Sequence, residues 1–352
     1  IFAYMGDLDD GTISKLTSEA SKISYRGPDQ SGYNQVADNV FLGFHRLSIM
    51  DESSNGNQPM FHPNDDKISM VCNGEIYNHH ELKAKYDIKT MSNSDCEVIL
   101  HLYKIMPLKE LLSELDGVFA FVINDNNKGA VFAARDPIGV RPLFIGSSSD
   151  GSYAFSSEAK SIVNLCSSVK QFSPGTFWSS ESPKKRPRYY SYRYKKNASS
   201  DLAEIKSNVR SKLTEAVRKR LMSDREVGCL LSGGLDSSLI ASLVQQNINE
   251  YGVGSTGLLK TKVPRRVKTF SIGMDGSPDL LFARKVAKWI GSDHHEVLLE
   301  PKDFLDAVPE VIEKIESYDT TTVRASVGNY LVSKYISDNT DCKVIFNGDG
   351  AD

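Results

Sequence analysis

The sequence predicts two domains of different class, an antiparallel α+β domain followed by an α/β domain with a parallel sheet. Residues 1–178 contain short β-branched or aromatic runs, such as "GVFAFVIND" and "GAVFAARD", which are separated by Asn, Asp and Gly turns. From about residue 201 onward, strand and helix patterns alternate, and this alternation indicates a parallel sheet with helices on both faces. A chain of 352 residues is long enough to bury a core in each domain.

In the first domain, the pattern predicts mostly strands. They are expected within residues 40–51, 67–78, 117–125, 129–136 and 142–146. Helices are expected within residues 11–23 and 95–115, the second because its apolar residues recur at roughly i, i+3 and i+4. Strands joined by tight turns, with few helices, are typical of an antiparallel α+β unit.

In the second domain, an amphipathic helix at residues 201–222 precedes alternating strands and helices. Strands are expected at 227–231, 268–273, 295–300 and 343–348, and helices at 236–248, 278–291, 303–319 and 324–339. Residues 249–266 fit neither pattern, so we expect a long mobile loop there.

Composition argues against several classes of protein. The net charge of −3 gives no general attraction to nucleic acid or to an anionic membrane, and no apolar stretch is long enough to span a bilayer. The five cysteines are scattered and include no C-x-x-C pair, which argues against a disulfide framework and a zinc knuckle. We therefore expect a cytoplasmic protein without membrane or nucleic-acid partners. Because the chain starts without Met and stops right after "NGDGAD", we also expect it to be a fragment.

Residues 184–200 are expected to link a domain of residues 1–183 to a domain of residues 201–352. The segment "KKRPRYYSYRYKK" interleaves basic residues with tyrosines, a pattern that can bind nucleic acid through phosphates and bases. It can equally be a linker whose Tyr190, Tyr192 and Tyr194 alternate into a neighbouring surface. One short patch in a chain of negative net charge is weak support for nucleic-acid binding, so we favour the linker.

The segment "LSGGLDSS" lies between a buried-type strand and a helix and has the features of a phosphate-binding turn. Ligands of an open parallel sheet bind at the carboxyl ends of its strands. Gly233 and Gly234 allow the backbone to turn tightly and to approach a ligand. Ser237 and Ser238 fall at the start of the helix, where free N–H groups and the helix dipole favour an anion. The alternative, a simple turn capped by serine, is disfavoured by a match over seven consecutive positions.

The counter-charge for a phosphate is expected to come from a metal ion, because the turn contains no lysine. Asp236 cannot contact a phosphate directly without repulsion, so its natural role is to hold a Mg²⁺ ion that does. Asp352, after a different strand of the same sheet, is the candidate second carboxylate.

"LSGGLDSS" resembles the pyrophosphate loop of ATP-pyrophosphatases, and "FSIGMDGSPDLLFARKVAKWIGSDHHEV", "ESYDTTTVRAS" and "FNGDGAD" extend the likeness to the glutamine-hydrolysing asparagine synthetase family. This resemblance implies that aspartate and ATP form a β-aspartyl-adenylate, which ammonia attacks to give asparagine, with release of AMP and pyrophosphate. It implies a catalytic role for Asp349 and an aspartate site at Thr321, Thr322 and Arg324. The ATP-binding residues that it implies are Leu231, Ser232, Gly233, Gly234, Asp236, Ser237, Ser238, Ile272, Gly273, Asn347 and Gly348.

The first domain resembles N-terminal-nucleophile (class II) glutamine amidotransferases through "SYRGPDQSG", "HRLSIMD", "VCNGEIYNH", "SDCEVI", "LDGVFAFVI" and "ARDPIGVRPLF". This resemblance implies a sandwich of antiparallel sheets between helices, ahead of an ATP-pyrophosphatase domain. It implies that Arg46 and Ile49 bind glutamine, with Arg46 on the α-carboxylate. Glu75 and Asp95 would hold the α-ammonium. The amide of Asn73 and the N–H of Gly74 would form the catalytic oxyanion hole, which needs fixed donors where negative charge develops.

The sequence departs from the family pattern in three places. The family begins Cys-Gly-Ile-Phe with a nucleophilic first cysteine, whereas this chain begins Ile1-Phe2. The chain ends at Asp352, before the helical C-terminal part of the family. The family's Ser-Gly-Glu-Gly reads here as residues 347–350, "NGDG", so the shorter Asp349 stands in place of glutamate.

The resemblance to the family also implies that the protein is a homodimer.

Two other functions fit parts of the pattern. A β-lactam-forming synthetase has the same two domains but typically loses the glutaminase site and replaces the acidic residue at position 349. Asn73, Gly74, Glu75, Asp95 and an acidic Asp349 favour asparagine formation instead. A non-catalytic paralogue could bind nucleotide or glutamine as a sensor, and a true absence of the first cysteine would favour that role.

Overall fold

The computed structural model of the chain describes residues 1–192, 201–251 and 266–350. By its internal contacts the chain divides into two compact units, Ile1–Lys195 and Lys196–Asp352. Each unit has its own hydrophobic cores.

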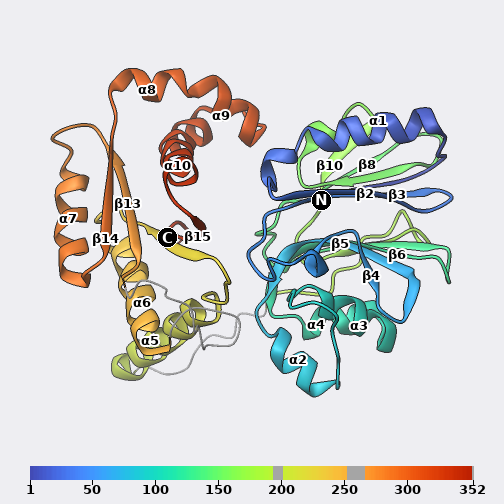
Figure 1. The fold of residues 1–352 in the computed structure, drawn as a ribbon, viewed down its shortest axis with the longest axis horizontal. Helices are drawn as coiled ribbons and strands as arrows, with labels where there is room; N and C mark the ends of the chain where they lie inside the picture. Colours follow the sequence, from blue (N-terminus) through green and yellow to red (C-terminus); the bar gives the residue numbers. More distant parts are fainter. Residues whose placement is uncertain (193–200, 252–265, 351–352) are drawn as a thin grey trace. The chain divides into compact units, whose positions relative to one another are not determined.

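The first unit contains two antiparallel sheets (Figure 1). The six-stranded sheet has the order β10 (Ser168–Gln171), β8 (Phe144–Ser147), β9 (Tyr153–Ser156), β1 (Phe2–Met5), β3 (Val40–Arg46) and β2 (Gln30–Ala37). The five-stranded sheet has the order β11 (Phe177–Ser179), β7 (Ala130–Arg135), β6 (Gly117–Asp125), β5 (Asp65–Ile76) and β4 (Met60–His62). This arrangement confirms the antiparallel α+β prediction, and each expected strand region overlaps one of these strands.

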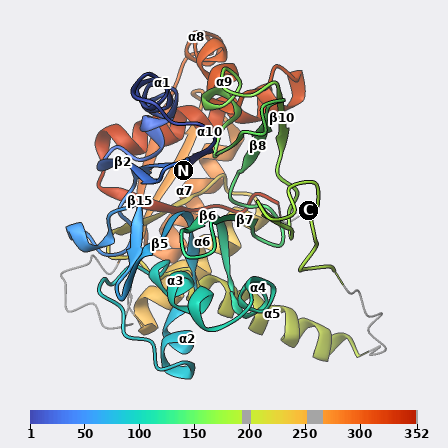
Figure 2. The same ribbon diagram turned by 90° about the vertical axis from the view of Figure 1, so that its right-hand side faces the viewer.

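Helices cover the outer face of each sheet, so the first unit has four layers (Figure 2). Helix α1 (Asp10–Ser21) packs Leu16 and Ala20 against the six-stranded sheet. Helices α3 (Glu97–Ile105) and α4 (Leu108–Glu114) pack on the five-stranded sheet. A further core lies between the two sheets and includes Leu42, Val122 and Trp178.

Several details of the first unit differ from expectation. Strands β1, β2, β4, β9, β10 and β11 were not expected. The helix expected over 95–115 is two helices, because Pro107 between them lacks the N–H that a continuous helix needs. Helix α2 (His79–Lys85) was not expected; it has seven residues, too few for a clear helical period.

The second unit is a four-stranded parallel sheet with helices on both faces, as predicted. Its order is β14 (Asp293–Leu298), β13 (Lys268–Gly273), β12 (Glu226–Leu230) and β15 (Cys342–Phe346). Helices α5 (Leu202–Lys219), α6 (Leu235–Tyr251) and α7 (Pro278–Ile290) share one core, and α10 (Thr320–Asn339) packs on the other face. Helices α8 (Pro301–Asp306) and α9 (Val308–Ile315) pack against α10. Because β13 and β15 lie on opposite sides of β12, the chain reverses its strand order beside β12, which is where ligands of such sheets bind.

The expected linker and mobile loop fall only partly within the described residues. Residues up to 192 pack on the first unit: Tyr189 donates from its hydroxyl to the carbonyl of Arg135 at 2.8 Å. Tyr190 and Tyr192, expected to alternate into a surface, are 39% and 49% exposed. Helix α6 continues to Tyr251, so residues 249–251 of the expected loop are helical instead. Residues 252–265 and Tyr194 lie outside the described residues.

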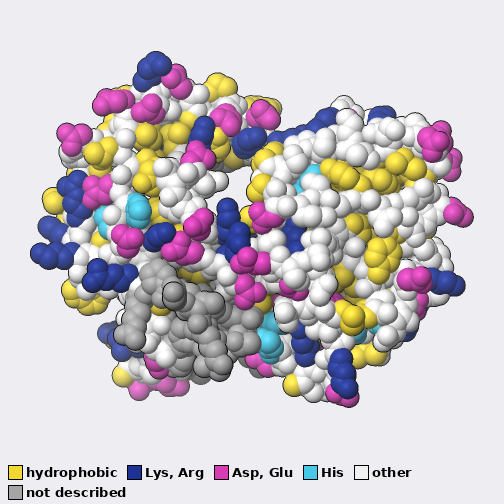
Figure 3. Space-filling view, in the orientation of Figure 1, with side chains coloured by type: hydrophobic (Ala, Val, Ile, Leu, Met, Phe, Trp, Pro, Cys, Tyr) yellow, Lys and Arg dark blue, Asp and Glu magenta, His cyan; other side chains and the backbone are white. Residues whose placement is uncertain are grey.

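Basic and acidic side chains are interspersed over the face shown in Figure 3. Among the helices that the structure describes, none combines the length and the apolar character needed to cross a membrane.

Candidate active sites

A pocket of about 240 Å³ in the first unit collects the residues predicted to bind glutamine. Its lining includes all six of them, Arg46, Ile49, Asn73, Gly74, Glu75 and Asp95, and also Ile1, Arg26, Cys72, Cys96 and Arg141. Residues 46, 73 and 95 are far apart in sequence, so the fold itself assembles this pocket.

Strand β5 supplies one wall of the pocket. Its residues Asn73, Gly74 and Glu75 pair in register with Ala120, Phe119 and Val118 of the neighbouring β6. The wall joins the helical side of the unit where the backbone N–H of Ile76 donates to Oδ2 of Asp95 at 2.6 Å. Asn73 and Gly74 are thus held on a strand, a more rigid support for an oxyanion hole than a loop would be.

Arg46, at the end of β3, is 5% exposed and holds the loop that follows it. Its Nη1 donates to the carbonyl of Ser53 and to Oδ1 of Asn57, both at 2.7 Å. Its Nη2 donates to the carbonyls of Met50 and Asp51. The side chain predicted to bind a carboxylate therefore also fixes the shape of loop 47–57, which explains why the strand expected over 40–51 ends at residue 46.

Glu75 forms an ion pair that the sequence analysis did not foresee. Its Oε1 accepts a hydrogen bond from Nη2 of Arg141 at 2.7 Å, and both residues line the pocket. Arg141 lies in "ARDPIGVRPLF", a segment quoted for its resemblance and given no role. A pairing between residues that far apart leaves no periodic signal in a single sequence.

Asp95 is buried, with 4% of its surface exposed. Burial, with a smaller contribution from the nearby charge of Glu75, raises the pKa of its carboxyl to about 6, despite the hydrogen bond from Ile76. Two carboxylates therefore share a pocket in which one of them is costly to ionise. A bound cation between them would remove that cost, which suits a substrate ammonium.

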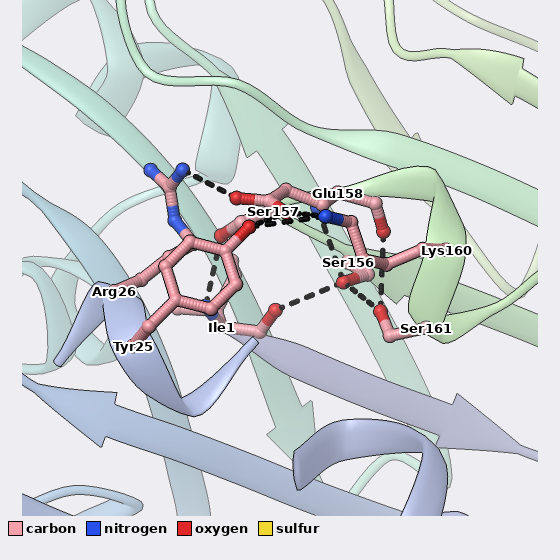
Figure 4. A network of polar contacts seen from close by, with 8 residues as sticks. All are labelled: Ile1, Tyr25, Arg26, Ser156, Ser157, Glu158, Lys160 and Ser161. Carbon is pink, nitrogen blue, oxygen red and sulfur yellow. Dashed lines mark hydrogen bonds and ion pairs between the residues drawn. The ribbon is translucent and has the colours of Figure 1, made fainter. Parts of the chain in front are cut away.

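The chain start lies against a polar network at the side of the pocket (Figure 4). The nitrogen of Ile1 donates to Oγ of Ser157 at 2.8 Å. Glu158 accepts hydrogen bonds from the hydroxyl of Tyr25 and from Nη1 of Arg26, the latter at 2.8 Å. This network holds the first strand beside Asn73 and Gly74.

A second pocket, of about 130 Å³, lies in the second unit where three strands end. Of the residues predicted to bind ATP, the lining includes Leu231, Ser232, Ser237, Ile272, Asn347 and Gly348, and the predicted catalytic Asp349 joins them. Asp279 and Asn329 also line it and were not predicted, because a single Asp in a helix start or Asn in a helix gives no distinctive pattern.

Two glycines set the close packing around this pocket. A Cβ on Gly348 would lie 2.6 Å from the nitrogen of Ser237, so glycine lets the turn after β15 touch the start of α6. Gly233 has φ +82°, and a Cβ there would lie 2.6 Å from the nitrogen of Ala283 in α7. The reason for glycine at 233 is therefore contact with a helix, in addition to the tight turn that was predicted.

The serines of the turn bond to one another. Oγ of Ser232 and Oγ of Ser237 are 2.9 Å apart, and the nitrogen of Gly234 donates to Oγ of Ser232 at 3.3 Å. Oγ of Ser238 is buried without a hydrogen-bond partner among the described residues. These groups form the start of α6, where an anion is favoured.

The predicted aspartate site is less complete. Thr322 donates from its backbone nitrogen and hydroxyl to Oδ2 of Asp319, at 2.9 and 2.8 Å, so it helps to cap α10. Arg324 lines a separate apolar groove between α8, α9 and α10. Asp349 accepts from Nδ2 of Asn329 at 3.5 Å. Asp352 lies outside the described residues.

Of the two carboxylates predicted to bind Mg²⁺, Asp236 lies within the described residues and Asp352 does not. The described residues contain no group of three or more metal-ligating side chains. Mg²⁺, however, commonly binds through one or two carboxylates together with substrate phosphates. Asp236 lies in the first turn of α6, and Gly348, which lines the pocket where phosphates are expected, packs against its backbone and Cβ. The residues present fit such an ion.

Comparison with known proteins bears directly on these two pockets. The glutamine amidotransferase domain family matches residues 1–194, and the asparagine synthase family matches residues 208–352. The first unit belongs to the glutamine amidotransferase domain family, whose model matches more than half of the chain. The second unit matches the asparagine synthase family.

Curated relatives are similar to this chain along its whole length. "Asparagine synthetase [glutamine-hydrolyzing]" of Cricetulus griseus is 42% identical over 381 residues, which cover 100% of this chain and 65% of the relative. The protein of the same name from Homo sapiens is 40% identical with the same coverage. The chain thus spans 65% of the length of these curated relatives.

Solved structures give a more distant likeness. The glutamine phosphoribosylpyrophosphate amidotransferase from B. subtilis, in complex with ADP and GMP, has a TM-score of 0.45 and 16% sequence identity. That comparison covers 99% of this chain and 90% of the other.

Proposed function

We propose that this protein makes L-asparagine from L-aspartate, with ammonia from glutamine hydrolysis and with ATP as the source of energy. The observation that carries the proposal is that one chain holds two separate pockets. One gathers Asn73, Gly74 and Asp95, and the other gathers Ser232, Ser237 and Asp349 at the ends of parallel strands.

In the first pocket, the acidic groups of Glu75 and Asp95 bind the α-ammonium of glutamine and the guanidinium of Arg46 binds its α-carboxylate. Nη1 and Nη2 of Arg46 already hold loop 47–57, so this contact needs a partial rearrangement of the side chain or the use of Nε. When the carboxamide is attacked, negative charge develops on its oxygen. The amide of Asn73 and the N–H of Gly74 stabilise that charge.

In the second pocket, the turn at 231–238 and the start of α6 bind the phosphates of ATP. The adenine lies toward Leu231 and Ile272, which line the pocket, and toward Gly273, which follows Ile272 at the end of β13. Asn347 and Gly348 line the same pocket. Thr321, Thr322 and Arg324 bind aspartate. Asp349 is the catalytic residue for the reaction of ammonia with the adenylate. An Mg²⁺ ion held by Asp236, with Asp352 as a second ligand, would neutralise phosphate charge when bound.

The proposal also includes the cellular compartment of the enzyme and its oligomeric state. All five cysteines are free, which suits the cytoplasm, a reducing compartment. A homodimer is proposed from the resemblance to the family alone. No nucleic-acid or membrane partner is proposed.

The test is a product assay on the full-length protein with aspartate, ATP and Mg²⁺. Asparagine, AMP and pyrophosphate should appear in equal amounts, with either glutamine or ammonia as the nitrogen source. Glutamate should appear only with glutamine. Nucleotide binding without any asparagine from either nitrogen source would instead support a sensor.

A further inference from the structure

We propose that Arg141 is a positioning residue of the glutamine pocket, which orients Glu75 to receive the α-ammonium of the substrate. The inference rests on the proposed function, since it concerns how the first pocket recognises glutamine. It assigns a role to a residue that neither the motifs nor the family comparison singled out.

The ion pair with Arg141 uses only one of the two carboxylate oxygens of Glu75. Oε1 of Glu75 accepts from Nη2 of Arg141 at 2.7 Å, and Oε2 has no hydrogen-bond partner among the described residues. Both side chains are largely shielded, with 14% of Glu75 and 28% of Arg141 exposed. Because one oxygen is fixed, the other is presented to the pocket in a defined direction. Asp95 reaches the same pocket from the start of α3, so an ammonium can contact both carboxylates.

The loop that carries Arg141 is held rigidly by two buried charged residues. The carboxylate of Asp136, 1% exposed, accepts backbone N–H bonds from the four residues 138–141, at 2.6 to 3.1 Å. The guanidinium of Arg135, 3% exposed, donates to the carbonyls of Gly139 and Arg141, each at 2.7 Å. Charged groups that bind loop backbone in this way preorganise the side chain that the loop presents.

Arg141 also has an unused donor. Its Nε is buried and has no hydrogen-bond partner among the described residues. Buried polar groups are nearly always paired, so an orphan donor in a pocket-lining side chain calls for a ligand or an ordered water. If the ion pair between Arg141 and Glu75 had only a structural role, nothing would require the unpaired Nε of Arg141 to lie beside the pocket.

The experiment is a calorimetric titration of the protein that begins at Ile1, from which no glutamine hydrolysis is expected. The ligands are glutamine and 4-carbamoylbutyrate, which is glutamine without its α-amino group. Arg141→Met should weaken glutamine binding about tenfold and leave 4-carbamoylbutyrate binding unchanged, because only glutamine has an ammonium for Glu75. Arg141→Lys should restore most of the loss. In a Glu75→Gln background, Arg141→Met should cause no further loss, since the effect of Arg141 passes through Glu75.

Lys85→Met is the matched control, because it removes an ion pair of the same unit, Lys85 to Glu114 at 2.6 Å, outside the pocket. It should leave both affinities unchanged. Equal weakening of both ligands by Arg141→Met, or no weakening of either, would overturn the role of Arg141 while leaving the proposed function in place. If the unaltered protein bound no glutamine, the proposed function would fail first, and this inference with it.

Discussion

The carboxylate of Asp51 accepts a hydrogen bond from the backbone nitrogen of Asn93 at 2.7 Å, across 42 positions of sequence. The other carboxylate oxygen accepts from the backbone and hydroxyl of Ser53, and the carbonyl of Asp51 accepts from Arg46. One residue therefore joins the loop that follows Arg46 to the loop that leads into Asp95. These loops adjoin Arg46 and Asp95, two of the residues expected to hold the two charged ends of glutamine.

Asp51→Asn should loosen both loops at once. An asparagine can keep one acceptor, but its amide nitrogen would face an N–H donor in place of the second carboxylate oxygen. Loss of a buried bond to a charged group costs about 1.5–3 kcal/mol. We expect the KM for glutamine to rise about tenfold, while ammonia-dependent asparagine synthesis stays within twofold of the unaltered protein. Steady-state assays with each nitrogen source measure the split.

The stability effect of this substitution should depend on pH. Burial opposes ionisation of Asp51, but hydrogen bonds from Ser53 and Asn93 hold the pKa of its carboxyl below the ordinary value of 3.8. A lowered pKa in the folded state gives stability that is present above pH 3.8 and is lost as pH falls below it. Denaturant unfolding should show the full difference between the unaltered protein and the Asp51→Asn variant at pH 7, and a smaller difference near pH 3.5. A difference that stayed constant would mean that charge is not the cause.

The glutamine pocket was predictable to the extent that its residues lie in recognisable segments. Arg46, Asn73, Gly74 and Asp95 were all predicted and all line one pocket. Asp51 stood inside the quoted segment "HRLSIMD" but received no role. Its function depends on a backbone nitrogen 42 residues away, and a backbone group has no sequence signature.

In the second pocket, too, the sequence predicted the elements but not the contacts that depend on how those elements pack. The alternation of strands and helices predicted the parallel sheet, and the turn residues predicted where the ligand should bind. The contact of Gly348 with the start of α6 was not predictable, because it depends on the order of strands β12 and β15 in the sheet. Similarly, the expected helix starting at Arg324 begins at Thr320, because Asp319 provides its cap.

Asp95→Asn should weaken glutamine binding and, in the same protein, increase stability at neutral pH. Burial raises the folded-state pKa of Asp95 from 3.8 to about 6. A carboxyl whose pKa is raised lowers stability progressively as pH rises from about 4 to 6, because the unfolded chain ionises more easily. Asparagine has no such cost and can still accept the bond from Ile76. The gain at pH 7.5 should be on the order of 2 kcal/mol.

Thermal unfolding of the unaltered protein and of Asp95→Asn at pH 4.5 and pH 7.5 checks the predicted change in stability. The variant should be more stable than the unaltered protein at pH 7.5 only. Binding of glutamine to the unaltered protein should weaken as pH falls through about 6, as Asp95 becomes neutral. The asparagine variant should lack that pH dependence. A variant less stable at both pH values would show that the carboxylate is stabilising, contrary to the argument from burial.

Asp236→Asn should abolish Mg²⁺-dependent ATP consumption and spare glutamine hydrolysis. The residue lies in the first turn of α6, in a different unit from the glutamine pocket. Loss of the carboxylate removes the expected metal ligand without emptying a buried core position. Aspartate-dependent pyrophosphate release and glutamate formation are measured in parallel. Normal pyrophosphate release in the variant would remove Asp236 from the proposed metal site.

The chain start provides the last prediction. The nitrogen of Ile1 donates a hydrogen bond to Ser157 (Figure 4). Ile1 also lines the pocket together with Asn73 and Gly74. Two residues joined to that nitrogen reach about 7 Å when extended, which is far enough to enter the pocket. A protein that begins with Cys-Gly ahead of Ile1 would bring both a thiol and a free α-amine there. An α-amine titrates near pH 8, which suits a general base at neutral pH.

We therefore expect glutamine hydrolysis when Cys-Gly precedes Ile1 with the initiator Met removed. No hydrolysis is expected from a protein that begins at Ile1, from one with Ser-Gly, or from one with the new amine acetylated. The two nearby thiols cannot substitute, since neither carries a free α-amine. In addition, a hydrogen bond with Cys72 and burial raise the pKa of Cys96 well above its ordinary value, which disfavours the reactive thiolate. A glutamate-release assay compares the four proteins. Turnover by the protein that begins at Ile1 would place the nucleophile elsewhere and exclude the mechanism with a first-residue cysteine.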